Sequence, residues 1–490
     1  MTLPFLPDAL CRAIIALLAG CGGMVRAIEV EGLPEPAEPR PVKLAIPVEK
    51  TLPNGLRVLV VERPGLPLIS AMLVIKSGAE ADSPQAAGLA SFVAALLTKG
   101  TAMRSATEIA GEVEALGATL KAEATWDATI TSLTTLSANS DPAFALLADV
   151  VRHPKFAPAE IERLRRQTLD DLRLSFEEPG TLAKLGAARA ILGTSPYAHA
   201  AAGIPASVAH LTRGEIANFH SRNFTPGHAL LVIAGNITTD AGFALAEKVF
   251  GDWKSTGPRE ATGTKPTAPP KPRATLIDMP NAGQAAVVLG APGITRKAED
   301  YFAGEVANAV LGGGYTSRLN QEIRIKRGLS YGARSTLDAM RGGGLFTARA
   351  QTKNASAAEV AQVMLAECAR LGSEDVSADY LATRQAVLTG EYAREFETNE
   401  SCVKRIADFA LHDLPLEILN QYADRIRAVS VTAVRAFAAK HFTPEAMSIV
   451  VAGNAKECAK PLREAFPKLE VIPQSALDLD SPALRKTTRR

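Results

Sequence analysis

Apolar and polar positions in the first half of the chain follow two different periods. The apolar runs "LRVLVVERP" (56–64) and "ISAMLVIKSG" (69–78) predict strands, and Asn54-Gly55 predicts a turn before the first of them. The alternating segment "TLKAEATWDATITSLTTL" (119–136) predicts a further pair of strands. Apolar residues recur at helical spacing in three other segments, which we predict as helices: 84–99, 105–116 and 158–176.

The second half of the chain shows the same alternation of strands and helices. The run "QAAVVLGAP" (284–292) and the alternating segment "GLFTARAQT" (344–352) predict strands. Between them, helical spacing predicts helices over 298–311 and 316–327.

Two segments of the chain nearly repeat each other. "FHSRNFTPGHALLVIAGNI" begins at Phe219 and "FAAKHFTPEAMSIVVAGNA" begins at Phe437, an offset of 437 − 219 = 218 residues. Each copy predicts the end of a helix, a Thr-Pro turn and a buried strand closed by Gly-Asn. An offset of this size is too large for a solenoid, so it indicates a duplicated α+β domain.

The predicted domains are separated by a segment rich in Pro, Thr and Gly, which we interpret as a linker. The predicted order along the chain is a signal peptide (1–27), a leader (28–47), an N-terminal domain (48–254), the linker (255–273), a C-terminal domain (274–470) and a tail (471–490).

The N-terminal residues are typical of an export signal. Arg12 precedes the apolar run "AIIALLAG" (13–20), which is too short to span a bilayer but suits the apolar part of a secretory signal. "VRA" (25–27) allows ordinary cleavage after Ala27, whereas "LAGC" (18–21) resembles a bacterial lipoprotein box that would leave Cys21 lipidated. Both alternatives predict an exported, periplasmic protein without a transmembrane span.

Composition excludes some classes of protein. The chain has 54 basic and 52 acidic residues and a net charge of +2, which gives no basic excess for binding nucleic acid. Outside the signal it has only Cys368, Cys402 and Cys458, and no C-x-x-C pair. We therefore predict neither a disulfide framework nor a cysteine-based zinc site.

The helix predicted over 84–99 contains "AGLASFVAALLTKGT" (87–101), whose apolar stripe by itself indicates a core helix. The residues at the two ends of this segment are Gly88-Leu89 and Lys99-Gly100-Thr101. Together with the C-terminal signature described below, they resemble the pitrilysin/insulinase family of zinc metallopeptidases, in the branch of mitochondrial processing peptidases and their bacterial relatives. The resemblance runs from about residue 48 to about residue 470. It implies two domains, each a mostly antiparallel sheet flanked by helices, that form half of a clamshell.

Active members of that family carry H-x-x-E-H within G-L-A-H-F-x-E-H-x-x-x-K-G-T. At the three motif positions this chain has Ser91, Ala94 and Ala95, which can neither ligate zinc nor accept a proton from water. A Glu on a later helix is the family's third ligand, and Asp170 or Asp171 falls near its position. We expect no metal and no cofactor in this chain.

The segment "LGGGYTSRLNQEIRIKRGLSYG" (311–332) resembles the family's C-terminal signature, G-G-G-x-x-S-R-L followed by an Arg and a Tyr. The resemblance implies that Arg324 and Tyr331 position the substrate by hydrogen bonding its backbone at the scissile carbonyl. The alternative for Arg324 is a helix-surface residue that pairs with Glu322 or with solvent, and the alternative for Tyr331 is a half-buried core tyrosine.

A second motif overlaps the first. "GLSYG" (328–332) matches G-x-S-x-G, the nucleophile elbow of serine hydrolases, which needs a strand before the serine and a helix after it. Here a predicted helix precedes Ser330 and an extended segment follows it. We interpret Ser330 as a turn residue.

Loss of the zinc motif and retention of the Arg/Tyr pair together suggest a division of labour. We hypothesise that the chain is the zinc-less subunit of a heterodimeric peptidase, inactive alone, whose homologous partner carries the zinc. The substrate would be an unfolded peptide, held partly by strand addition to an edge strand at 119–127 that the resemblance implies. The alternatives are a peptide-binding, chaperone-like homodimer without proteolysis, a purely structural subunit, and a serine hydrolase acting through Ser330.

Overall fold

The strands of the protein form two six-stranded sheets. The computed structural model describes residues 44–254 and 269–486, so the predicted signal with Cys21, most of the leader and most of the linker lie outside the described residues. In spatial order the first sheet contains β1 (Val48–Thr51), β2 (Arg57–Glu62), β6 (Ala229–Gly235), β3 (Leu68–Ile75), β5 (Thr129–Leu136) and β4 (Thr119–Ala124). The second contains β12 (Glu470–Pro473), β7 (Ala274–Asp278), β11 (Ser448–Gly453), β8 (Ala285–Pro292), β10 (Gly344–Thr352) and β9 (Ala333–Ala339).

The two sheets share one topology. In the first, β6 runs parallel to β2 and antiparallel to β3; in the second, β11 runs parallel to β7 and antiparallel to β8. Strands β6 and β11 are the buried strands of the two sequence repeats. The predicted fold class is confirmed, since the chain is an α+β protein of two domains with mostly antiparallel sheets. The last strand, β12, runs three residues beyond the boundary expected at residue 470.

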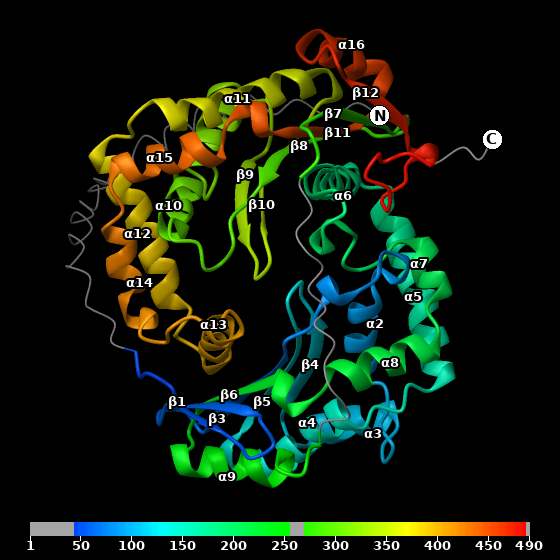
Figure 1. The fold of residues 1–490 in the computed structure, drawn as a ribbon, viewed down its shortest axis with the longest axis vertical. Helices are drawn as coiled ribbons and strands as arrows, with labels where there is room; N and C mark the ends of the chain where they lie inside the picture. The colour runs from blue at the N-terminus through cyan, green and yellow to red at the C-terminus, as the bar shows by residue number, and fades with distance from the viewer. Residues whose placement is uncertain (1–43, 255–268, 487–490) are drawn as a thin grey trace, which may run out of the picture. The chain divides into compact units, whose positions relative to one another are not determined.

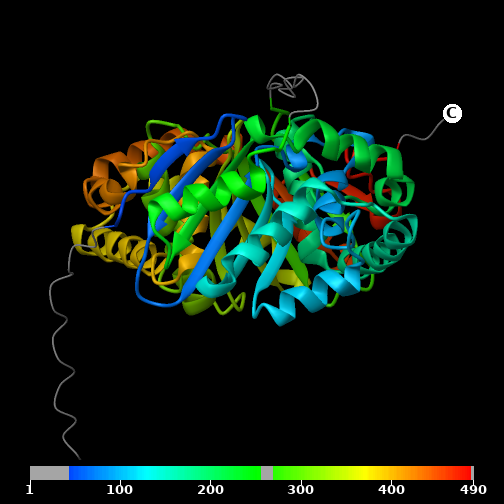
Figure 2. The ribbon, with the colours of Figure 1, turned by 90° about the horizontal axis from the view of Figure 1, so that it is seen from below.

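Side chains of the first sheet point alternately to two apolar layers. One face packs on α4 (Ser140–Arg152) and α9 (Thr239–Phe250), which cross the sheet in the view from below (Figure 2). The other face packs on α13 (Asn399–Leu411), which comes from the second half of the chain. The strand residues are therefore buried on both sides, which explains why β2, β3 and β6 read as nearly continuous apolar runs.

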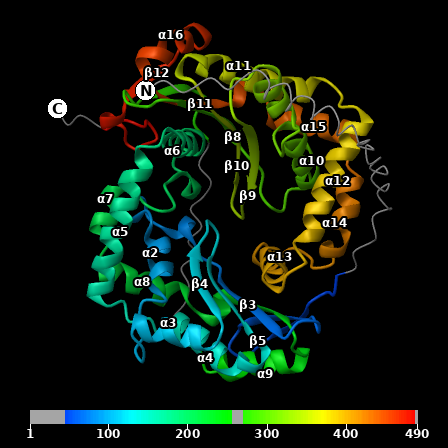
Figure 3. The same ribbon diagram turned by 180° about the vertical axis from the view of Figure 1, so that it is seen from behind.

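The second sheet is likewise covered on one face by a helix from the first half of the chain. One face packs on α10 (Tyr301–Leu311) and α11 (Ala357–Ser373), which in turn contact α15 (Val431–His441), and the other face packs on α6 (Pro179–Leu192) (Figures 1 and 3). A Cβ on Gly186 of α6 would lie 3.2 Å from Ile277 Cδ1 and 3.4 Å from Val450 Cγ1, so glycine permits this close approach. Each sheet is thus covered by one helix from the other half of the sequence.

Most predicted helices are confirmed, and one begins later than predicted. Helix α5 (Pro158–Phe176) has the predicted bounds, and α3 (Ala106–Ala115) begins after its cap, Ser105. The helix predicted over 84–99 is a 3-10 turn, η2 (Pro84–Ala86), followed by α2 (Leu89–Leu96). It breaks at Gly88, whose φ of +93° is left-handed, and the carboxylate of Asp82 accepts hydrogen bonds from the Gly88 and Ala90 amides.

Further helices complete the fold. They are α7 (Pro205–His210), α8 (Arg213–Asn223), α12 (Ala378–Arg394), α14 (Ile418–Arg427) and α16 (Ala455–Ala465). None of the helices in residues 44–254 and 269–486 is long and apolar enough to cross a membrane.

A buried polar network joins the turn before β5 to the second half of the chain. Asp127 accepts hydrogen bonds from the Tyr197 hydroxyl (2.6 Å) and the Arg341 amide (2.9 Å), and it lies 3.7 Å from His412 Nε2. His412 Nδ1 also lies 3.4 Å from a carboxylate oxygen of Asp408. Burial alone would lower the pKa of His412, but these two carboxylates outweigh it and raise the pKa to about 9.

Thermal stability is expected to fall as pH rises from 6.5 to 9. A histidine whose folded-state pKa is raised stabilises fully below its unfolded pKa of about 6.5, and this contribution disappears as pH passes the folded-state value. For His412 the loss is about 2–3 kcal/mol. Melting curves of wild type and His412→Gln across this range test it. The variant should show a much flatter pH dependence, and an equally steep one would contradict the assignment.

Candidate functional site

The three zinc-motif positions lie on α2 and hold no group suited to a metal. Ser91 Oγ donates a hydrogen bond to the Ala201 carbonyl at 2.9 Å, so its hydroxyl serves packing between segments. Ala94 is buried and Ala95 is half-buried. Helix α2 therefore keeps the core function predicted from its apolar stripe.

The later acidic positions do not complete a site. Asp170 and Asp171 lie on α5, which packs beside α2, but both side chains are exposed. Asp170 pairs with Arg173 at 3.0 Å. Within the described part of the chain, no group of three or more His, Cys, Asp or Glu side chains could hold a metal ion. The structure thus brings the two helices together without a donor set that fits zinc.

Arg324 and Tyr331 lie together at one end of the second sheet. Arg324 is on η6 (Asn320–Lys326), the helix predicted over 316–327, which is a π-helix. Its guanidinium carbon is 5.0 Å from the ring centre of Tyr331 and 4.7 Å from that of Tyr315. The guanidinium therefore contacts two aromatic rings, an arrangement in which cation–π attraction restrains a long side chain.

The structure excludes a pairing of Arg324 with Glu322 and a core position for Tyr331. Glu322 binds Lys326 and Arg327, each at 2.6 Å, and these hydrogen bonds lower its pKa; it does not pair with Arg324. Tyr331 is 91% exposed, so it is not a core tyrosine. Its hydroxyl and the Arg324 guanidinium have no hydrogen-bond partner among the described residues. Both groups are consequently free to bind a ligand.

The loop that carries Tyr331 is fixed from two sides. Thr352 Oγ1 donates to the Leu329 carbonyl at 2.6 Å, and Asn320 Oδ1 accepts from the Ala333 amide at 2.8 Å. The Asn320 amide also donates to the Gly314 carbonyl at 3.1 Å. Asn320 is a positioning residue that the sequence did not predict, since its only signal there is its place inside the signature.

Ser330 is a turn residue, as predicted. Its hydroxyl donates to the Gly332 carbonyl at 2.8 Å and accepts from the Gly332 amide at 3.1 Å. The π-helix η6 precedes it and β9 follows it, the reverse of the strand-to-helix order of a nucleophile elbow. Ser330 is therefore not placed as a hydrolase nucleophile.

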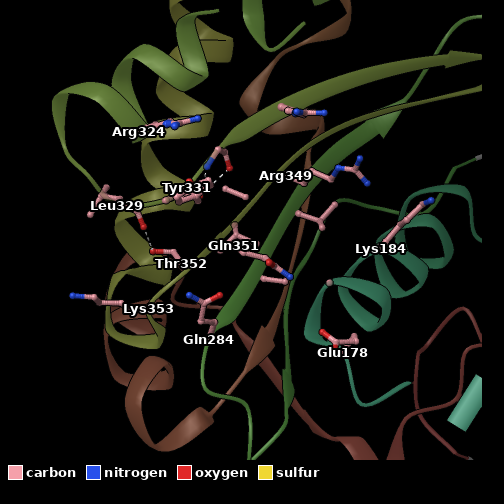
Figure 4. Close-up of a pocket in the computed structure, with 18 of the residues that line it drawn as sticks. Glu178, Lys184, Gln284, Arg324, Leu329, Tyr331, Arg349, Gln351, Thr352 and Lys353 are labelled. Carbon is pink, nitrogen blue, oxygen red and sulfur yellow. Dashed lines mark hydrogen bonds between the residues drawn. The ribbon is translucent and has the colours of Figure 1, made fainter. Parts of the chain in front are cut away.

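Arg324 and Tyr331 line a pocket of about 930 Å³ between η6, the second sheet and α6 (Figure 4). Glu178, Thr181 and Lys184 line it from α6 and the residue before it, and Arg349 and Gln351 line it from β10. Because α6 comes from the first half of the chain, both halves build this pocket. A phenol and a guanidinium in such a pocket can donate hydrogen bonds to a carbonyl oxygen and stabilise negative charge on it.

Models of two related domains match the chain. Residues 57–184 match the insulinase domain of peptidase family M16, and residues 210–388 match the M16 inactive domain. An uncharacterized zinc protease of Mycobacterium leprae is 28% identical over 413 residues, which cover 83% of this chain and 92% of that protein. A second, from Mycobacterium tuberculosis, is 29% identical over 415 residues, covering 83% of this chain and 93% of that protein.

Solved structures share the fold. A peptidase M16 inactive domain from Pseudomonas fluorescens superposes with a TM-score of 0.77 at 29% identity, covering 83% of this chain and 98% of that one. A protease from Helicobacter pylori superposes with a TM-score of 0.79 at 21% identity, covering 84% of this chain and all of that one. The second likeness concerns the fold alone.

Proposed function

Because this chain belongs to the pitrilysin/insulinase-like M16 peptidase family, we propose that it is the zinc-less subunit of a heterodimeric peptidase. The observation that carries the proposal is the contrast between its two candidate sites. Ser91, Ala94 and Ala95 cannot bind zinc, whereas Arg324 and Tyr331 line an accessible pocket with free donor groups. A structural subunit would have no need to keep such a pair.

In the proposed complex this chain binds and orients an extended, unfolded peptide. Tyr331 and Arg324 donate hydrogen bonds to the carbonyl at the bond to be cleaved, and the fixed loop holds the phenol where negative charge develops. The partner, a homologous chain carrying H-x-x-E-H, supplies zinc and with it the activated water. Strand β4 lies at the edge of the first sheet, where a peptide strand can add. The N-terminal pattern supports a periplasmic location for the complex, either soluble or anchored through Cys21.

The proposal is tested by purifying the tagged chain from its native cell envelope and identifying co-purifying proteins by mass spectrometry. We expect a chain of similar size that carries H-x-x-E-H, and cleavage of an unstructured peptide by the pair but by neither chain alone. Recovery of self-associated chain only, with peptide binding but no cleavage, would instead support a peptide-binding homodimer.

Zinc removal should separate the roles of the two chains. Treating the complex with a chelator is expected to lower peptide cleavage by at least about a hundredfold, because the activated water is lost, and added zinc should restore it. The melting temperature of this chain alone should not change, because its zinc-motif positions carry no ligands. A chelator-dependent shift in the isolated chain would show that it binds metal itself.

A further inference from the structure

The pocket that contains Arg324 and Tyr331 is strongly cationic. Five basic side chains line it, contributed by α6, η6, β9, β10 and the residue after β10: Lys184, Arg324, Arg334, Arg349 and Lys353. The one acidic side chain in the lining is Glu178. Figure 4 shows Arg349 on its strand and Lys184 on the neighbouring helix, on the same pocket as Arg324.

These charges are not neutralised within the protein. None of the five basic side chains forms an ion pair within 4.0 Å in residues 44–254 and 269–486. Four of them are exposed, and Arg324 is half-buried. The carboxylate of Asp338 is near enough to Lys184 and Arg349 for them to oppose the rise in its pKa that burial causes. A single carboxyl does not balance this cluster of five basic side chains.

Two of the arginines face each other directly. In the register of the edge strand β9 and its neighbour β10, Arg334 is opposite Arg349. Like charges opposite each other in an antiparallel pair destabilise it. The adjacent pair on the same face, Thr336 and Thr347, is complementary, with hydroxyls 3.0 Å apart. The unfavourable arginine pair therefore lies beside a favourable threonine pair on the wall of the pocket. An anion bound between the two guanidiniums would relieve the repulsion between them.

We propose that the paired arginines of β9 and β10 form a subsite for a carboxylate of the bound peptide. This inference rests on the proposed function, since it assumes that the pocket receives a peptide. A guanidinium binds a carboxylate through two parallel hydrogen bonds, and Lys184 adds a third positive charge from α6. Because Tyr331 lines the same pocket, the recognised carboxylate lies within a few residues of the bond to be cleaved. The substrate class is therefore an extended peptide with an acidic side chain or a free C-terminus near that bond.

The inference is tested by anisotropy of fluorescently labelled twelve-residue peptides binding to the purified chain. One peptide carries two central Glu residues, a second has Gln in their place, and a third is the Glu peptide with an amidated C-terminus. We expect the Glu peptide to bind roughly tenfold more tightly than the Gln peptide. If instead the Glu and Gln peptides bind equally and amidation of the Glu peptide weakens its binding, the terminal carboxylate is the recognised group.

Matched variants separate a local site from overall charge. The variant Arg334→Gln/Arg349→Gln should bind the carboxylate-bearing and carboxylate-lacking peptides about equally. The variant Lys460→Gln/Arg463→Gln, which removes two exposed charges on α16, should keep the wild-type preference. Equal binding of all three peptides to the wild-type chain would overturn the carboxylate subsite and leave the proposed function intact. Failure of all three peptides to bind would overturn both. The wild-type comparison decides the question even if the arginine variant misfolds.

Discussion

Tyr331→Phe is expected to lower kcat for peptide cleavage by the assembled complex by about 10²–10³-fold, with little change in KM. The substitution removes one hydroxyl, and a donor that acts where charge develops in the transition state contributes to kcat rather than to ground-state binding. Stability should not change, because that hydroxyl has no partner among the described residues and the ring is 91% exposed. Steady-state kinetics with an unstructured peptide, with melting curves alongside, provide the measurement.

The neighbouring Tyr315 provides a matched control. Its ring also contacts the Arg324 guanidinium, and it is 58% exposed. Tyr315→Phe removes a hydroxyl from the same cluster while keeping the ring, so kcat should remain within about twofold of wild type. An unchanged kcat in Tyr331→Phe, or equal losses in the two variants, would remove Tyr331 from the proposed mechanism.

The sequence predicted the Arg/Tyr site because its residues lie close together in the chain. Arg324 and Tyr331 are seven positions apart, so a local signature contains both. The parts of the pocket that come from distant segments could not be predicted in this way. Lys184 and Glu178 reach it only because α6 packs on the second sheet, and no local pattern encodes that contact.

Secondary structure could likewise be predicted where a local pattern determines it and not where other contacts do. The helix over 158–176 was predicted with its observed bounds because its periodicity is long and uninterrupted. The predicted start of the helix over 84–99 was wrong because a left-handed glycine and the carboxylate of Asp82 set where α2 begins, and periodicity does not detect such features. The π-helical form of η6 was also missed, since a local change of hydrogen-bond register leaves the apolar pattern nearly unaltered.

Residues 44–254 and 269–490 are expected to aggregate when each is produced alone and to form a soluble complex when they are co-expressed. Each sheet needs a helix that the other segment carries, α13 for the first sheet and α6 for the second. Loss of α6 would uncover Ile277, Val288 and Val450, and would expose Leu182 and Ile191 on the helix itself. Exposing each such side chain costs about 1.5–3 kcal/mol, so the three on the second sheet alone cost about 5–9 kcal/mol, comparable to the net stability of about 5–15 kcal/mol that is typical of a domain.

A pair of substitutions on α6 tests whether this helix is the reason. Ala187 is fully buried against the second sheet, so Ala187→Asp places an unpaired carboxylate there and should abolish the complex. Lys184→Gln alters the exposed side of the same helix and should leave assembly intact. Size-exclusion chromatography and melting curves of the co-expressed segments distinguish the two. If 269–490 alone were soluble, monomeric and cooperatively folded, the second sheet would not need α6. The helix exchange would then be an accessory contact rather than the interaction that joins the two halves into one folding unit.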